Sequence, residues 1–166
     1  MTSLRLRKAV RDDLPALIDI ENAAFATDRI SRRSWLRLLA SRSAAVTVAV
    51  DGPAVIGCSV VLRNARTRIA RLYSIAVAGQ ARCRGIARLL IEEAAATAPR
   101  SGACVIRLET RIDNLPAHKL FERSGFRPFA HVAGYYRDGA EAIRYQRPLS
   151  PGSNWHAGSD RADIPL

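Results

Sequence analysis

The amino-acid sequence predicts one α/β domain, in which about four helices flank a sheet of about seven strands. Alternating or β-branched apolar runs, typical of strands, are interleaved with segments whose apolar residues recur at three- and four-residue spacing, typical of helices. A chain of 166 residues has the length of one domain with its own core. Its composition, 48% hydrophobic and 25% charged, is that of an ordinary globular protein and excludes collagen-like, coiled-coil and wholly disordered chains.

The first half of the chain is predicted to form a strand, two helices and then three strands. Residues 3–7 alternate as a strand does, and residues 11–24 carry apolar side chains at helical spacing. A second helix is predicted at 31–41, with Ser31 as its N-cap. The period then becomes that of strands, which we expect at residues 45–50, 55–62 and 69–77. Asp51-Gly52 is a typical hairpin turn between the first two of these strands.

The second half alternates between helices and strands. Residues 86–97 predict a strong helix that Pro99 ends. A buried strand follows at 104–109, and then a helix that Asp113-Asn114 caps and Gly125 stops. The last two strands are predicted at residues 126–132 and 140–146. The complete order is βααβββαβαββ.

We expect the domain to span residues 1–149. Residues 150–166 have no apolar period and are rich in Gly, Ser and Pro, which predicts a flexible C-terminal tail, although Trp155 is unusual in such a segment. No apolar run approaches the roughly 20 residues that a membrane span needs. The first seven residues lack the apolar core of a secretion signal. We therefore expect a cytoplasmic protein that is not exported and has no membrane segment.

The cysteines and histidines do not form a recognisable metal-binding pattern. Cys58, Cys83 and Cys104 have neither CxxC nor metal-type spacing, and their odd number favours reduced thiols. The three histidines are dispersed along the chain. No metal cofactor is expected.

The charge of the chain is unusual. There are 26 basic and 15 acidic residues, a net charge of +11, and all but two of the basic residues, Lys8 and Lys119, are arginines. A basic domain invites a nucleic-acid interpretation. However, the arginines are scattered over the whole chain, and aromatic residues for base stacking make up only 6%. Nucleic acid is therefore disfavoured as the primary ligand, whereas compositional bias, a polyanionic small ligand or an acidic partner each account for the charge.

One turn between a strand and a helix has the features of a phosphate site. It contains the pattern Arg82-x-x-Gly85-x-Ala87, with Arg84 and Arg88 beside it. Gly85 allows the backbone to approach a ligand closely, and the free N–H groups of the first helical turn carry partial positive charge. The turn is neither a Walker loop nor a dinucleotide-binding GxGxxG. Taken alone, a glycine at a strand-to-helix turn is structural more often than it is part of a binding site.

Taken with its neighbours, this turn resembles the acetyl-CoA pyrophosphate loop of the GNAT N-acetyltransferases. Residues 114–126 (NLPAHKLFERSGF) resemble the family's next motif, and the order of helices and strands agrees as well. The resemblance covers about residues 4–149. It is strongest to the RimI-like subgroup, which acetylates protein N-termini, and rests there on the Ile75-Ala76-Val77 and Leu108-Glu109-x-Arg111 motifs and on the segment around Tyr135-Tyr136. It implies a mixed, mostly antiparallel sheet.

The resemblance implies that acetyl-CoA is the co-substrate, bound by two main segments. The segment expected to bond the pantetheine arm comprises Ile75, Ala76 and Val77. The segment expected to hold the pyrophosphate comprises Arg82, Cys83, Arg84, Gly85, Ile86, Ala87 and Arg88. Asn114 would bond the pantetheine near its sulfur end. Cys83 is expected to react readily with alkylating agents and to be protected by CoA.

The resemblance also implies the catalytic groups. Glu109 ends a predicted strand and corresponds to the general base, whereas without the resemblance it would be a surface carboxylate paired with Arg107 or Arg111. Phe121 stands where the family usually has the tyrosine that protonates the thiolate, and phenylalanine has no proton to give. Tyr73, Tyr135 and Tyr136 are candidates to replace it, solvent is another, and Phe121 would then only pack against the CoA arm.

The acceptor side is predicted from five residues in three parts of the chain. Tyr135 and Tyr136 resemble tyrosines that line a peptide groove, although paired tyrosines on a strand also serve in core and edge packing. Asp28 and Arg29 lie between the first two helices, where acceptor specificity is usually set. Arg29 would favour an acidic acceptor, and a solvated loop is the alternative. Tyr73 is assigned to the same side of the site.

The expected activity is direct transfer of an acetyl group to a primary amine, most favourably a protein N-terminal α-amine, by a monomer or a homodimer. Two alternatives are retained. One is acetylation of a small amine or a lysine side chain. The other is a non-catalytic acetyl-CoA-binding module, which the substitution at Phe121 keeps open.

Overall fold

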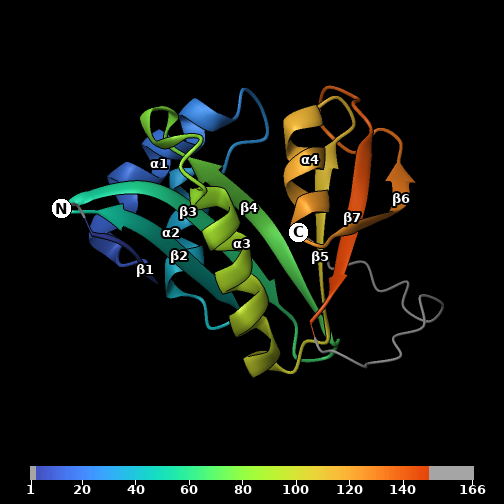
Figure 1. The fold of residues 1–166 in the computed structure, drawn as a ribbon, viewed down its shortest axis with the longest axis horizontal. Helices are drawn as coiled ribbons and strands as arrows, with labels where there is room; N and C mark the ends of the chain where they lie inside the picture. Colours follow the sequence, from blue (N-terminus) through green and yellow to red (C-terminus); the bar gives the residue numbers. More distant parts are fainter. Residues whose placement is uncertain (1–2, 150–166) are drawn as a thin grey trace.

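A seven-stranded sheet forms the centre of the structure, a computed structural model that describes residues 3–149 (Figure 1). The strands are β1 Leu4–Lys8, β2 Ala44–Asp51, β3 Ala54–Arg63, β4 Ile69–Val77, β5 Val105–Arg111, β6 Arg127–Val132 and β7 Ala142–Pro148. The helices are α1 Leu14–Ala24, α2 Arg32–Ala40, α3 Ile86–Thr97 and α4 Leu115–Arg123. The predicted element order is confirmed. The tail predicted from residue 150 onward, with Trp155, lies outside the described residues.

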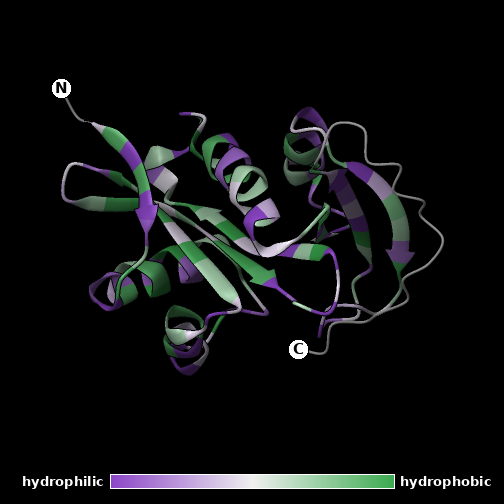
Figure 2. Ribbon diagram, turned by 90° about the horizontal axis from the view of Figure 1, so that it is seen from below, coloured by the Kyte–Doolittle hydropathy of each residue, from purple (hydrophilic) through white to green (hydrophobic). Residues whose placement is uncertain are grey.

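The spatial order of the strands is β1-β2-β3-β4-β5-β7-β6, and neighbouring strands are antiparallel except β4 and β5. Helices α1 and α2 cover one face of the sheet, and α3 and α4 lie on the other (Figures 1 and 2). The β1–β4 arm has a dense core, in which Leu17, Trp35, Val48 and Leu90 are fully buried.

Strands β4 and β5 pair only at their beginnings. Among the described residues, the parallel register joins Ile69–Arg71 to Val105–Arg107 and extends no further. Beyond this point the two strands diverge toward their carboxyl ends, which the upper part of Figure 1 shows. Their backbone groups on the facing edges are therefore not used in pairing with each other. The turn before α3 and the beginning of α4 follow these two carboxyl ends.

The β5–β7–β6 arm has one apolar face. Leu108, Phe121, Phe126 and Tyr145 are buried together beneath α4. Because side chains alternate along a strand, the residues between them project to the opposite face. In Figure 2, hydrophilic and hydrophobic bands accordingly alternate along the strands of this arm.

Two of the predicted caps are confirmed, and several predicted boundaries are shifted: β5, predicted at 104–109, ends at Arg111, and β7, predicted at 140–146, is Ala142–Pro148. The Ser31 hydroxyl accepts from the Ser34 N–H at 3.1 Å, and Asn114 Oδ1 accepts from the Ala117 N–H at 3.3 Å. The helix predicted from residue 11 begins at Leu14 instead, because Arg11–Asp13 forms a 3₁₀ turn. The Asp13 carboxylate folds back over this turn.

Asp13 ties the beginning of α1 to β1. Its carboxylate accepts from the Val10 N–H at 2.8 Å and from two Arg7 nitrogens at 2.7 and 2.8 Å. The Asp13 side chain is only 7% exposed. The Arg7 hydrogen bonds and the Val10 N–H outweigh burial and lower the pKa of the carboxyl below its ordinary value.

We expect Asp13→Asn to lower the free energy of unfolding by about 2 kcal/mol at pH 7, because hydrogen bonds to a charged group are lost. A lowered pKa means that the stabilisation is complete above the unfolded pKa of about 4 and is lost as pH falls through the folded pKa. Urea unfolding from pH 7 to pH 2 should show the difference between wild type and variant shrinking below about pH 4. A difference that does not change with pH would contradict this ionic role for Asp13.

Candidate active site

The turn predicted to bind phosphate forms the N-terminus of α3. Gly85 is the N-cap, with φ +74°, and Cys83 is also left-handed, with φ +62°. The N–H groups of Ile86, Ala87 and Arg88 belong to the first helical turn, so the helix itself gives them no acceptor. Residues 82–85 are exposed, and a Cβ built on Gly85 meets nothing within 4 Å. This exposed helix N-terminus is suited to an anion.

The three arginines of this turn lie in different places. Arg84 Nη2 is 2.9 Å from Asp51 Oδ2, so this guanidinium is held by the β2–β3 hairpin. Arg82 and Arg88 are exposed. Arg82 and Arg88 are therefore the side chains that remain for a phosphate, whereas Arg84 contributes its backbone and a link to the hairpin.

Sequence reasoning missed a second glycine that this arrangement needs. A Cβ on Gly57 of β3 would lie 3.1 Å from Ile86 Cγ2, 3.3 Å from the Ala76 carbonyl oxygen and 3.4 Å from Leu90 Cδ1. Gly57 thus allows α3 to pack closely on the sheet. The signal in the sequence was a glycine inside a strand otherwise rich in β-branched residues, which often marks a close approach to a neighbouring element.

The segment predicted to bond pantetheine lies on the free edge of β4. On one side Ile75, Ala76 and Val77 pair with β3, and the other side faces the region where β5 has diverged. Just before this segment the register shifts, because Val60 and Val61 oppose Ser74 and Leu72, which leaves Tyr73 as a β-bulge. A bulge redirects the strand, and it occurs often beside active sites.

Glu109 lies between two arginines that sequence reasoning did not assign to it. Its Oε2 accepts from Arg71 Nε at 3.0 Å, and its Oε1 is 3.4 Å from Arg144 Nε. The Glu109 side chain is 11% exposed. The partners that the sequence suggested are engaged elsewhere, since Arg111 pairs with Asp138 at 2.6 Å and Arg107 donates to Gln146 at 3.3 Å. Glu109 is therefore an oriented carboxylate, not a surface strand end.

Tyr135 and Tyr136 join this cluster. The Tyr135 hydroxyl accepts from Arg71 Nη2 at 2.5 Å, and the two tyrosine rings pack edge to face with centroids 5.0 Å apart. Burial, and then the nearby Glu109 carboxylate, raise the pKa of Tyr135. Burial, and then Tyr135 and Glu109, raise the pKa of Tyr136 to about 12. Both phenols therefore hold their protons at neutral pH.

Tyr73 is linked to the same cluster through Arg71, whose guanidinium lies 5.5 Å from the centroid of the Tyr73 ring. One arginine of β4 thus contacts Glu109, Tyr135 and Tyr73, three of the residues predicted for the site. Sequence reasoning missed Arg71 and Arg144, although both occur in predicted strands. Their positions depend on which strands become neighbours.

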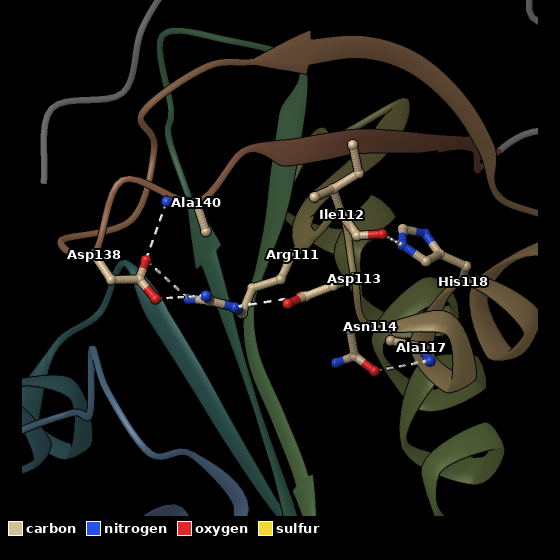
Figure 3. Close-up of polar contacts among 8 residues, drawn as sticks. All are labelled: Arg111, Ile112, Asp113, Asn114, Ala117, His118, Asp138 and Ala140. Carbon is tan, nitrogen blue, oxygen red and sulfur yellow. Dashed lines mark hydrogen bonds and ion pairs between the residues drawn. The ribbon is translucent and has the colours of Figure 1, made fainter.

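Asn114 and the end of β5 are drawn in Figure 3. Asn114 Oδ1 is used to cap α4, and the amide nitrogen of this side chain remains for a ligand. Arg111 contacts Asp138 in the loop before β7, and the Asp138 carboxylate also accepts from the Ala140 N–H at 3.1 Å. His118 bonds the Ile112 carbonyl oxygen at 3.0 Å and holds the turn between β5 and α4. The Arg111–Asp138 contact ties the loop that carries Tyr135 and Tyr136 to the end of β5.

Phe121 is buried and packs among aromatic rings. Its centroid lies 5.8 Å from that of Phe126 and 6.1 Å from that of Tyr145. The ring therefore has a packing role in the core beneath α4.

The segment between α1 and α2 approaches the loop after β6. Asp28, with φ +54°, lies 3.8 Å from Arg137 Nε. Arg29 Nε donates to the Phe25 carbonyl oxygen at 2.5 Å, so this guanidinium is used within its own loop. The structure thus brings Asp28, and not the Arg29 guanidinium, into contact with the segment that bears Tyr135 and Tyr136.

A buried carboxyl that sequence reasoning missed holds this loop in place. Glu21 is 2% exposed, accepts from the Ile30 N–H at 3.0 Å, and accepts from the Ser74 hydroxyl at 3.3 Å. Burial raises its pKa. Glu21 therefore connects α1 and the beginning of α2 to β4, next to the bulge. The only sign of this in the sequence was that Glu21 lies at helical spacing with the apolar residues of the predicted helix, and therefore on its buried face.

Cys83 differs from the other two cysteines, because it is exposed whereas Cys58 and Cys104 are buried. Burial, and then the neighbouring Glu21, raise the pKa of the Cys58 thiol to about 12, so this thiol is unreactive. We expect alkylation of the native protein to label Cys83 first and CoA to slow this labelling. Mass spectrometry of iodoacetamide-treated protein, with Cys83→Ser as control, measures both. Equal rates with and without CoA would contradict the placement of Cys83 beside the pyrophosphate.

Residues 3–149 contain no group of three or more His, Cys, Asp or Glu that could hold a metal ion. Within the same residues, every helix is too short or too polar to cross a membrane.

Comparison with known proteins agrees with this geometry. Residues 12–126 match the model of the acetyltransferase (GNAT) family. An N-alpha-acetyltransferase of Saccharolobus solfataricus is 37% identical over 83 residues, which are 49% of this chain but only 50% of that protein. N-alpha-acetyltransferase 30 of Schizosaccharomyces pombe is 32% identical over 101 residues, 59% of this chain and 67% of that protein. The solved structure of the ribosomal-protein-S18-alanine N-acetyltransferase from Escherichia coli matches with a TM-score of 0.80 at 24% identity, over 93% of this chain and 99% of that one.

The family model matches more than half of the chain. The structure agrees with it, because β4 and β5 diverge beside an exposed helix N-terminus. This chain therefore belongs to the acetyltransferase (GNAT) family.

Proposed function

We propose that this GNAT protein transfers an acetyl group from acetyl-CoA to the N-terminal α-amine of a polypeptide. The observation that carries the proposal is the cluster of Glu109, Arg71 and Tyr135 where β4 and β5 diverge. An oriented carboxylate at this point is suited to receive a proton from an incoming ammonium group. The names of the two N-alpha-acetyltransferase relatives support an α-amine acceptor.

The residues present fit acetyl-CoA, which supplies an activated acetyl thioester when bound. The N–H groups at the beginning of α3 would hold the pyrophosphate, with Arg82 and Arg88 beside them. Among the described residues, the edge of β4 at 75–77 that faces β5 is not paired with another strand, so it offers backbone groups to the pantetheine arm. Asn114 retains an amide nitrogen for the same arm.

The acceptor amine must first lose a proton, because only a neutral amine attacks a carbonyl group. Glu109 would take this proton, directly or through water. Arg71 holds the carboxylate from one side and Arg144 from the other, so they are positioning residues.

The second proton is the one that the leaving thiolate needs. Phe121 has none to give. Tyr135 and Tyr136 have raised pKa values and hold their protons at neutral pH, so these phenols, Tyr73 or solvent would supply the proton. We infer that Tyr135 also orients Arg71, because its hydroxyl accepts from that guanidinium.

The proposal is tested with a panel of acceptors and acetyl-CoA. We expect acetylation at the α-amine of peptides with free N-termini, located by tandem mass spectrometry, and no reaction with the same peptides blocked by formylation. Acetylation of lysine side chains or polyamines alone would move the function to the small-amine or lysine alternative. CoA binding by calorimetry without transfer to any amine would identify the non-catalytic module that Phe121 leaves open.

A further inference from the structure

The β5–β7–β6 arm has a second face, opposite α4, that is rich in arginine. Ile106, Leu108 and Tyr145 point to the α4 side and are buried. The residues that alternate with them are polar, and all but Gln146 carry charge. Five side chains form a surface that we call the arginine face. One is at the start of β4 and four are on this arm: Arg71, Arg107, Glu109, Arg127 and Arg144.

The strand register places these side chains together. Arg71 on β4 is beside Arg107 on β5, Arg107 is opposite Gln146 on β7, and Gln146 is opposite Arg127 on β6. One row of side chains thus crosses four strands. Residues that pair across neighbouring strands project to the same face. In the next row Glu109 is opposite Arg144.

Among the described residues, three arginines of this face, Arg71, Arg127 and Arg144, outnumber its one carboxylate. One carboxylate, Glu109, is shared by two guanidinium groups, those of Arg71 and Arg144. Arg144 Nε is buried and forms no hydrogen bond within the described part of the chain. Arg127 is exposed and adds a further positive charge. By contrast, the charge of Arg111, at the end of the same face, is compensated by Asp138 and Asp113.

We propose that the arginine face binds an acidic segment of the acceptor polypeptide, directly after its N-terminal residue. The inference rests on the proposed function, because Glu109 marks the position of the reacting amine. From β4 to β6 the row spans three interstrand spacings, about 14 Å, which an extended peptide covers in about four residues. Acidic side chains at about positions 2 to 5 of the acceptor would therefore face the arginines.

This assignment gives the acidic preference a different origin from the one the sequence suggested. The Arg29 guanidinium is bonded to its own loop and does not belong to the arginine face. A nucleic acid is the less favourable occupant, because its phosphates would have to pass Glu109, whereas a peptide brings a cationic amine to that carboxylate. Phe129, 39% exposed beneath the Arg107 guanidinium at 4.8 Å, adds an apolar contact for a peptide side chain.

The test compares two acceptor peptides with the same N-terminal residue, one with Asp and Glu at positions 2–5 and one with Asn and Gln there. We expect kcat/KM to be about tenfold higher for the acidic peptide at about 50 mM salt, and this ratio to shrink at about 300 mM, because the attraction is screened. The Arg107→Gln/Arg127→Gln double variant should lose most of the ratio and leave the amide peptide unaffected. Arg100→Gln, which removes one exposed charge from the turn after α3, is the control.

Binding of the same peptides, labelled at the C-terminus, to the CoA-saturated protein separates this inference from the proposed function. Selective binding of the acidic peptide without acetylation would support the face and refute the α-amine activity. Equal binding and equal kcat/KM for the two peptides would contradict the proposal that the arginine face binds an acidic segment. A single-stranded RNA that binds more tightly than the acidic peptide, and loses binding in the double variant, would overturn it in favour of a nucleic-acid surface.

Discussion

Glu109→Gln is expected to lower kcat/KM for acetyl transfer by about 10²- to 10³-fold at pH 7. Glutamine keeps the size of the side chain but accepts no proton, and its amide nitrogen would face a guanidinium, since both carboxylate oxygens of Glu109 lie near one. If Glu109 takes the proton of the amine, the variant should recover part of its rate at alkaline pH, where the amine loses its proton unaided. The measurement is the pH profile of kcat/KM with a peptide acceptor.

The matched control is Glu141→Gln in the loop before β7, where the carboxylate contacts only His131 among the described residues. This variant should retain the wild-type rate and pH profile. Comparable thermal melting of the two variants would show that the loss at Glu109 is not a loss of folding. A Glu109→Gln protein with the wild-type rate and profile would remove Glu109 as the base.

Gly85→Asp is expected to weaken CoA binding by about 10- to 100-fold, the effect of one extra negative charge about 6 Å from a phosphate at an effective dielectric constant of about 20 to 40. Gly85 is left-handed, a conformation that Asp and Asn tolerate better than other side chains. A Cβ at this position meets no neighbouring atom within 4 Å. The fold should therefore survive the change. Isothermal titration with CoA provides the dissociation constants.

Gly85→Asn is the control, because it has the same shape and the same backbone demands without the charge. We expect only a small change in CoA affinity for this variant. If both variants bind CoA with the same affinity, charge at the N-terminus of α3 does not act on the ligand, and the pyrophosphate must be placed elsewhere.

The part of the site that the sequence predicted well is the part built from consecutive residues. Gly85 as the beginning of α3 and Asn114 as the cap of α4 are both confirmed. Each depends on local rules, namely that a left-handed position favours glycine and that an amide oxygen accepts from the first turn of a helix.

The environment of Glu109 could not be predicted in the same way. Arg107 and Arg111 were the expected partners because they are two residues away in the same strand. The actual partners, Arg71 and Arg144, are 38 and 35 positions away, and they reach Glu109 only because β4 and β7 become the neighbours of β5. Strand order is a property of the whole sheet, and no local pattern encodes it.

The charges of the chain also show which properties are local and which depend on the tertiary structure. The sequence determined that the chain is strongly basic, that the GNAT motifs follow one another in order, and that the residues of the α3 turn and Glu109 are present. Composition, period and turn chemistry act over a few neighbouring residues. The tertiary structure decided which charges are compensated: Arg84 is held by Asp51 and Arg111 by Asp138, whereas Arg71 and Arg144 share one carboxylate. Coulombic interactions depend on distance in space, and here that distance is set by strand register, by the β4 bulge and by the point at which β4 and β5 diverge.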